Sequence, residues 1–216
     1  GVIGALGSGS LKTLVAWQVI ISVGTLLAPI SLGSEAGLSA ALFYLLSTTW
    51  TVGGLFLVSE LVANQRGSAQ DRIVTAPKMQ NRTFLSVLFL VGAVAAAGLP
   101  PLSGFFGKVL ILQSVQSGTE MAWLWSVLLI GSFLTVIAYS RAGSIVFWRT
   151  VDGHLEKPDP LNGRISVAAG ALTALAVAIV VLAGPITRYT DETATQLFNN
   201  DAYINILQTP VVGEDD

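Results

Sequence analysis

A single lysine, Lys108, interrupts the apolar stretch "GLPPLSGFFGKVLIL" that covers residues 98–112. A lysine at the centre of a membrane-spanning helix costs about 2.5–3.5 kcal/mol on insertion scales, so it is retained mainly where it faces a polar cavity or has a polar partner. Burial away from water disfavours a charged ammonium, and a lysine held in such a place can release and rebind a proton. The residue type and its setting make Lys108 a candidate proton carrier.

Two prolines precede this lysine and predict a break in a helix. Pro100 and Pro101 have no N–H to donate, and broken helices at membrane depth are tolerated where they line a wet cavity. Such breaks expose helix ends, which many transporters use to bind ions, and Ser103 and Gly104 leave room for water. The alternative interpretation is that a helix starts at Ser103. Lys108 would then lie only about 7–8 Å along it, and its side chain would reach the membrane surface.

Other polar side chains in apolar surroundings also have two interpretations. Lys12, in "GSGSLKTLVAW", is either an anchor at the membrane surface or a member of a buried polar chain. Ser47, Thr48 and Thr49 form a polar patch that either hydrogen-bonds to its own helix or holds water for a proton path. The candidate proton path from the sequence therefore contains Lys108, Lys12, Ser47 and Thr48.

The composition is typical of a membrane protein. Of the 216 residues, 52% are hydrophobic and 11% are charged, against about 25% charged residues in average soluble domains. The formal net charge of −2 gives no sign of nucleic-acid binding. The chain has no cysteine and one histidine, His154, so thiolate or histidine metal sites and disulfides are excluded, and we expect no metal and no cofactor.

We predict an all-α fold, a polytopic membrane helix bundle with about six transmembrane helices, one of them short or broken. A spanning helix needs roughly 20 mostly apolar residues, and six segments approach this: 11–32, 37–62, 84–99, 102–117, 121–148 and 165–186. Lone strands cannot satisfy their backbone in hydrocarbon, so these segments must be helices.

The sequence also predicts three parts of the chain. Residues 1–10 look like the end of a preceding helix and a short loop, 11–186 form the helix bundle, and 187–216 are a polar C-terminal tail. Within the tail, 193–207 is a candidate surface helix. The apolar start without a methionine indicates a piece of a longer protein.

Membrane orientation stays open at this level. The loop 63–83 and the loop 149–164 are both basic. If the short segment 102–117 crosses the membrane by itself, these loops lie on opposite sides. The two sides then carry nearly equal numbers of Lys and Arg, and the positive-inside rule assigns no orientation.

Several stretches resemble one family over essentially the whole chain. "GLPPLSGFFGK", the "LKTLVAW…SVG" helix start, "AALFYLLSTTWTVGGLFL" and "YSRAGSIVFWR" are similar to the antiporter-like membrane subunits shared by Mrp (Pha) cation/proton antiporters and respiratory complex I. The resemblance is strongest to the D subunit of the Mrp/Pha antiporters. It implies a fold of about fourteen spans built from two inverted five-helix repeats, of which this chain is the C-terminal part.

The resemblance also implies roles for individual residues. Lys108 matches a lysine on the broken twelfth helix that passes protons towards one membrane face, and Lys12 matches a lysine at the start of the ninth helix. Two positions depart from the pattern on the tenth helix: Ser47 stands where a histidine is frequent, and Val52 stands where a lysine is frequent. The central polar axis is therefore interrupted unless Ser47, Thr48 and water fill the gap.

By this resemblance the chain is a secondary-transport subunit, not an enzyme, in the inner membrane of a bacterium. Its partners would be the other Mrp/Pha subunits, the lipid bilayer, protons, and Na⁺ or K⁺. One alternative is a proton-pumping subunit of complex I or of a membrane-bound hydrogenase. Another is a scaffold fragment without transport of its own, in which Lys108 reaches the surface.

Overall fold

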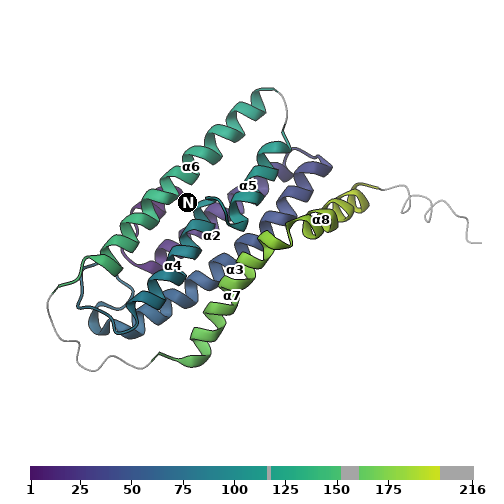
Figure 1. The fold of residues 1–216 in the computed structure, drawn as a ribbon. Helices are drawn as coiled ribbons and strands as arrows, with labels where there is room; N and C mark the ends of the chain where they lie inside the picture. The colour runs from purple at the N-terminus through teal and green to yellow at the C-terminus, as the bar shows by residue number, and fades with distance from the viewer. Residues whose placement is uncertain (116–117, 152–160, 200–216) are drawn as a thin grey trace, which may run out of the picture.

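The computed structural model describes residues 1–115, 118–151 and 161–199, which form a bundle of helices packed side by side (Figure 1). The helices are α1 (Val2–Leu6), α2 (Leu11–Ile30), α3 (Glu35–Gln65), α4 (Arg82–Ala97), α5 (Ser103–Gln113), α6 (Thr119–Gly143), α7 (Gly163–Val181) and α8 (Ala183–Phe198). A short 3₁₀ turn, Gly67–Ala69, follows α3, and a π-helical turn, Ser144–Trp148, extends α6.

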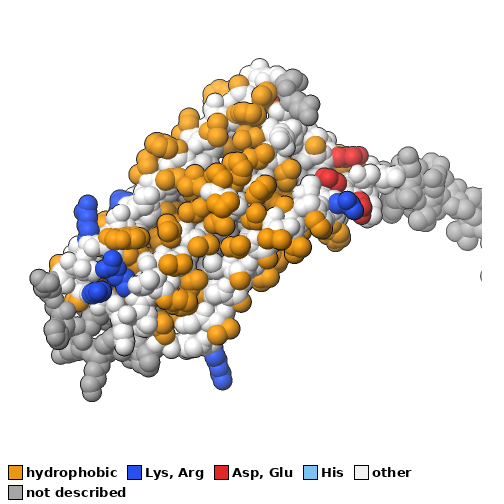
Figure 2. Space-filling model, viewed as in Figure 1, with side chains coloured by type: hydrophobic (Ala, Val, Ile, Leu, Met, Phe, Trp, Pro, Cys, Tyr) orange, Lys and Arg blue, Asp and Glu red, His pale blue; other side chains and the backbone are white. Residues whose placement is uncertain are grey.

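The bundle carries its apolar side chains on the outside as well as in its core. In the described part of the chain, α2, α3, α6 with its π-helical turn, and α7 are each long and apolar enough to cross a membrane. Large apolar residues on α6 face outward, among them Trp123, Val127 and Phe133, and Figure 2 shows apolar side chains spread along the length of the molecule. Such a surface suits hydrocarbon rather than water. The chain is a multi-pass membrane protein.

Helix α3 is the centre of the bundle, and α4 and α5 together run antiparallel to it. Gln65, at the end of α3, accepts a hydrogen bond from the backbone N–H of Asn81, just before α4. At the other end Ser47, in the first half of α3, hydrogen-bonds to Ser103 at the start of α5. Between these points Leu55 packs against Gly92 of α4. The two segments 84–99 and 102–117, predicted as separate candidate helices, are therefore two halves of one broken crossing.

This arrangement settles the relative position of the two basic loops. Thr150 forms a bridge to Ala76 in the loop after α3, and the N–H of Val151 donates to the carbonyl of Ala76. Both loops thus lie at the same end of the bundle. They would lie on opposite sides only if segment 102–117 crossed the membrane by itself, and it does not. Figure 2 shows most Lys and Arg side chains of this face gathered at that end, with Asp and Glu near α8 at the other.

One arginine of this end is structural. Arg66 is buried, with 1% of its surface exposed. Its guanidinium donates to the backbone carbonyls of Gln70, Arg72 and Val74. It thereby holds together the loop between α3 and α4.

Helix α8 continues the path of α7 along α3 after a single intervening residue, Leu182. The hydroxyl of Ser39 on α3 donates to the carboxylate of Asp191 on α8, at 2.5 Å. The last predicted span, 165–186, thus ends earlier than expected, at Val181. The predicted surface helix over 193–207 coincides with α8 only up to Phe198, and residues 200–216 lie outside the described residues.

Candidate functional site

The helix break leaves two backbone carbonyls without backbone donors. Gly98 ends α4 in the left-handed conformation (φ 77°, ψ 42°), and the N–H of Leu99 donates back to the carbonyl of Val94, as in a Schellman motif. The carbonyls of Ala96 and Ala97 would normally accept from the residues four positions later. Those residues are prolines and have no N–H.

Two polar side chains bind these carbonyls. The ammonium of Lys108 donates to the carbonyl of Ala97 at 2.9 Å and to the hydroxyl of Ser132 on α6 at 2.8 Å. The amide of Gln18 on α2 lies 3.5 Å from the carbonyl of Ala96. The C-terminal end of a helix carries partial negative charge and favours a cation. The double proline thus creates the binding position that Lys108 occupies.

The Lys108 side chain lies inside the bundle. It is 7% exposed, and its stem packs so closely on Gly98 that a Cβ there would come within 2.6 Å of the lysine Cδ. The Lys108 side chain therefore does not reach the surface in the structure, contrary to the alternative interpretation of the sequence. Pro100 and Pro101 lie in the turn between α4 and α5, and Gly104 packs directly on the backbone carbonyl of Ala95.

Further hydroxyl groups surround the break. Ser47 and Ser103 are both buried and are hydrogen-bonded at 2.9 Å. The hydroxyls of Thr48 and Ser22 are 2.6 Å apart, and the hydroxyl of Tyr44 interacts with both. We call Gln18, Ser22, Tyr44, Ser47, Thr48, Ser103, Lys108 and Ser132 the polar cluster. Its members come from α2, α3, α5 and α6, so the cluster joins four helices.

Residues of the predicted polar patch differ in their hydrogen-bond partners. Thr49 hydrogen-bonds to the carbonyl of Leu45 in its own helix, the local bonding that is common for such residues. Ser47 and Thr48 instead contact other helices. Val52, where the family pattern frequently has a lysine, is a partly buried residue packed on the apolar core.

Two hollows meet at Lys108. One, of about 300 Å³, is lined by Gly98 and Pro100 of the break. The other, of about 360 Å³, is lined by Thr25 of α2. Lys108 and Ser132 line both. A water molecule takes about 30 Å³ of liquid volume, so each hollow has room for several. Most of the other lining residues are apolar, so Lys108 and Ser132 are the polar side chains that the two hollows share.

Lys12 lies apart from this cluster. Its ammonium is 2.7 Å from a carboxylate oxygen of Glu60, and both side chains are more than one-third exposed. Its backbone N–H donates to Asp71 in the loop after α3. The buried face of α2 between Lys12 and Gln18 is apolar, with Leu14 and Val15 fully buried. The structure does not bring Lys12 together with Lys108.

We expect the Lys12–Glu60 pair to contribute little to stability. Exposed ion pairs are typically worth about 0.2–1 kcal/mol, so a double-mutant cycle with Lys12→Gln and Glu60→Gln should give a coupling energy below about 1 kcal/mol. Denaturant unfolding of the detergent-solubilised protein measures it. A coupling of several kcal/mol would contradict the exposed position that the structure gives the pair.

Four members of the cluster, Gln18, Ser22, Tyr44 and Ser132, were missed at the level of the sequence. Gln18 is fully buried, and its side-chain oxygen has no hydrogen-bond partner among the described residues. A glutamine in the apolar run "LVAWQVII" was the available signal. Ser132, in "LIGSFL", had no signal in the pattern, because one serine in an apolar helix is common and can bond to its own backbone.

A comparison with known families identifies this architecture. Residues 1–138 match the family model described as NADH:quinone oxidoreductase/Mrp antiporter, TM. The chain belongs to this family. The resemblance predicted from "GLPPLSGFFGK" and the other motifs is thus confirmed, and the chain is a membrane subunit of the antiporter-like type.

Individual antiporter-like subunits match along most of this chain. The probable K(+)/H(+) antiporter D subunit of Rhizobium meliloti (strain 1021) is 33% identical over 226 residues, which cover 91% of this chain and 41% of that protein. The NADH-quinone oxidoreductase N subunit of Hirschia baltica is 28% identical over 182 residues, 84% of this chain and 38% of that protein. The chain spans about two-fifths of the length of these relatives.

The fold also matches a solved antiporter-like structure. A chain of the Mrp complex from Dietzia sp. DQ12-45-1b superposes with a TM-score of 0.77 at 20% identity, covering 94% of this chain and 46% of that one. At this identity the match establishes the shared fold. If the broken crossing α4–α5 is the family's twelfth helix, α3 is the eleventh and α2 the tenth. The positions Lys12, Ser47 and Val52 then lie one helix later than the sequence predicted.

Proposed function

We propose that this chain is the proton-conducting part of a subunit of a multisubunit monovalent cation/proton antiporter, with Lys108 as the group that binds and releases protons. The observation that carries the proposal is the buried ammonium held by Ala97 and Ser132 in a helix break between two hollows. The family match and the 33% identity to a relative named as a probable K(+)/H(+) antiporter D subunit support it.

The contacts of Lys108 suit a reversible proton carrier. A charged lysine has three donors and no acceptor, and two donors are used by Ala97 and Ser132. When the ammonium gives its proton to water in one hollow, the neutral amine gains a lone pair. The hydroxyl of Ser132 can then donate to that lone pair, so the neutral form keeps a partner. Rebinding a proton from the other hollow completes the transfer.

The remaining members of the polar cluster extend the path in this proposal. The pair Ser47–Ser103 and the pair Ser22–Thr48 place hydroxyls, which both donate and accept, beside the break. With intervening water they take the place of the histidine and lysine of the family pattern. Lys12, which is paired with Glu60 at the end of the bundle, takes no part in proton transfer in this mechanism.

The rest of the machinery lies with other parts of the assembly in this proposal. Because the chain covers 41% of its antiporter relative, we infer that upstream helices and the other Mrp/Pha subunits complete the proton path and supply the path for Na⁺ or K⁺. The assembly resides in a bacterial cell membrane. These residues alone are not expected to transport.

Transport by the assembled complex tests the proposal. The complete complex containing this chain is reconstituted in liposomes with an acidic lumen and a pH-sensitive dye. Addition of Na⁺ or K⁺ outside should then dissipate the pH gradient, whereas choline should not. A complex that leaves the gradient unchanged with every monovalent cation is not an antiporter.

The identity to an NADH-quinone oxidoreductase N subunit favours a second candidate, a proton-pumping subunit of a redox complex. The partners separate the two. Co-purification of small hydrophobic subunits supports the antiporter, and co-purification of flavin and iron–sulfur subunits supports the redox pump. In the scaffold alternative Lys108 reaches the surface, whereas in the structure its ammonium lies inside the bundle.

We further propose that the basic end of the bundle faces the cytoplasm. Cytoplasmic loops carry an excess of Lys and Arg. Described basic residues at this end, in or next to the loops that meet there, are Lys12, Arg66, Arg72, Lys78, Arg82, Arg141, Arg149 and Arg164.

Single-cysteine labelling is expected to show this orientation. The chain has no cysteine of its own, so Lys78→Cys and Glu192→Cys, both at exposed positions, can be compared in a cysteine-free background. An impermeant maleimide should label Glu192→Cys in intact cells, and Lys78→Cys only in inside-out vesicles. The reverse pattern would invert the proposed orientation.

A further inference from the structure

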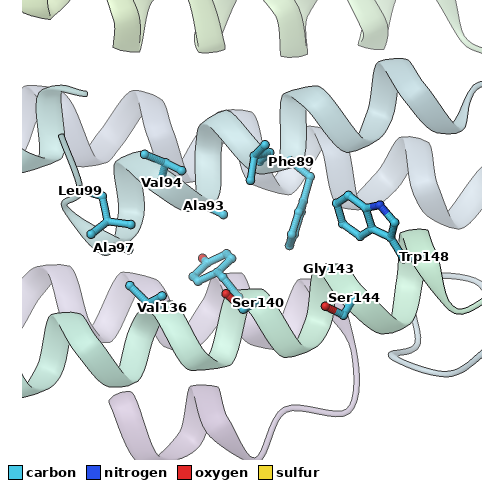
Figure 3. Close-up of a pocket in the computed structure, with 12 residues that line it drawn as sticks. Phe89, Ala93, Val94, Ala97, Leu99, Val136, Ser140, Gly143, Ser144 and Trp148 are labelled. Carbon is cyan, nitrogen blue, oxygen red and sulfur yellow. The ribbon is translucent and has the colours of Figure 1, made fainter. Parts of the chain in front are cut away.

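The outer face of α6 carries a groove against α4 that the proton path does not use. The groove is a cavity of about 290 Å³. Figure 3 shows Phe89, Val94 and Leu99 on one side facing Val136 of α6 on the other, with Trp148 near one end. Its walls are mostly apolar, and it runs from the basic end of the bundle towards the helix break.

A basic hollow adjoins this groove. The hollow, of about 410 Å³, is lined by Arg141 and Arg149 and shares Ser140 and Ser144 with the groove. Arg141 donates from one terminal nitrogen to the carbonyl of Ser8, and its Nε–H has no partner among the described residues. Neither guanidinium is paired with a carboxylate within residues 1–115, 118–151 and 161–199. Two arginines that have no carboxylate partner in this part of the chain therefore lie beside an apolar groove.

We propose that this site binds one anionic phospholipid. Its phosphate lies between Arg141 and Arg149, and one acyl chain lies along the groove towards Leu99. Arginine forms strong charge-assisted hydrogen bonds to phosphate, and basic pockets on the cytoplasmic side of membrane proteins bind anionic head groups. The hydroxyls of Ser140 and Ser144 supply further donors at the junction of head group and chain.

The arrangement fits a lipid better than a peptide partner. The basic hollow lies at the basic end of the bundle, and the apolar groove extends from it along the helices towards the middle of the bundle. A phospholipid has the same order of groups, a charged head followed by apolar chains. The outward face of α6 beyond the groove is mostly apolar, with Val127 and Phe133 exposed, so the charges of the site are confined to the basic end.

The lipid would also adjoin the proton carrier. Leu99 and Val136, which line the groove, also line one of the hollows at Lys108. The end of the acyl chain would therefore close the bundle beside that hollow and keep its water from the hydrocarbon.

Lipid titration of the complete complex tests the site. Native mass spectrometry in mild detergent follows binding of added phosphatidylglycerol and phosphatidylcholine. We expect selective binding of phosphatidylglycerol, weakened about thirtyfold by Arg141→Gln with Arg149→Gln. Because Arg141 also supports Ser8, Arg149→Gln alone serves as the milder variant, with about a fivefold loss expected.

A matched pair of charge removals is the control. Lys78→Gln with Arg164→Gln takes away two exposed positive charges from the same end, outside the groove, and should leave the affinity unchanged. The proposal is overturned if this control weakens binding as much as the arginine pair, or if the arginine variants keep the original affinity. Equal binding of phosphatidylcholine overturns it, as does cross-linking of a cysteine at Val94 to a neighbouring subunit.

Discussion

Lys108→Ala is expected to abolish cation-driven proton exchange by the assembled complex, down to the level of liposomes without the complex. The variant removes the group that binds the proton and leaves the Ala97 carbonyl without its donor. Lys108→Arg is expected to fail equally, because a guanidinium stays charged and cannot release a proton. Exchange is measured by dissipation of an imposed pH gradient at equal amounts of complex.

Two further variants separate loss of chemistry from loss of structure. An unpartnered buried carbonyl costs about 1–3 kcal/mol, so Lys108→Gln, which keeps a donor near Ala97, should assemble normally and still fail to transport. Lys78→Ala, in the exposed loop, should behave as the wild type. Full exchange by Lys108→Ala or Lys108→Arg would remove Lys108 from the mechanism.

Gly104→Ala is expected to destabilise the complex strongly through the helix break. A Cβ at Gly104 would collide with the backbone carbonyl oxygen of Ala95, and backbone cannot rotate out of the way as a side chain can. Helix α5 must then move away from α4, which also pulls Lys108 from Ala97. Overpacking of this kind typically costs about 1–3 kcal/mol, and the thermal unfolding midpoint in detergent should fall accordingly.

Another glycine provides the control for that experiment. A Cβ at Gly170 in α7 meets no atom within 4 Å, so Gly170→Ala should leave stability unchanged or raise it by up to about 1 kcal/mol through helix propensity. If Gly104→Ala and Gly170→Ala unfold at the same temperature, the close contact between α5 and Ala95 is not a feature of the native protein.

Local chemistry in the sequence determined the type of fold and the position of the break. Apolar runs of about 20 residues predict spanning helices, because hydrocarbon leaves the backbone no other partner. Pro100 and Pro101 lack an N–H, so a ladder that reaches them must end. In the structure, the carbonyls of Ala96 and Ala97, four residues before these prolines, consequently bind other donors.

Only the tertiary structure decided which groups supply those donors. Lys108 is eleven residues from Ala97 along the chain, but Gln18 is 78 residues from Ala96. Ser132, which accepts the second hydrogen bond from Lys108, comes from a third helix. Likewise, the segments 84–99 and 102–117 are one crossing because both pack along α3. Contacts between helices depend on how whole faces fit together, and apolar faces in a membrane protein look alike in a linear pattern. Hydrophobicity therefore predicts that helices exist, and packing alone selects their neighbours.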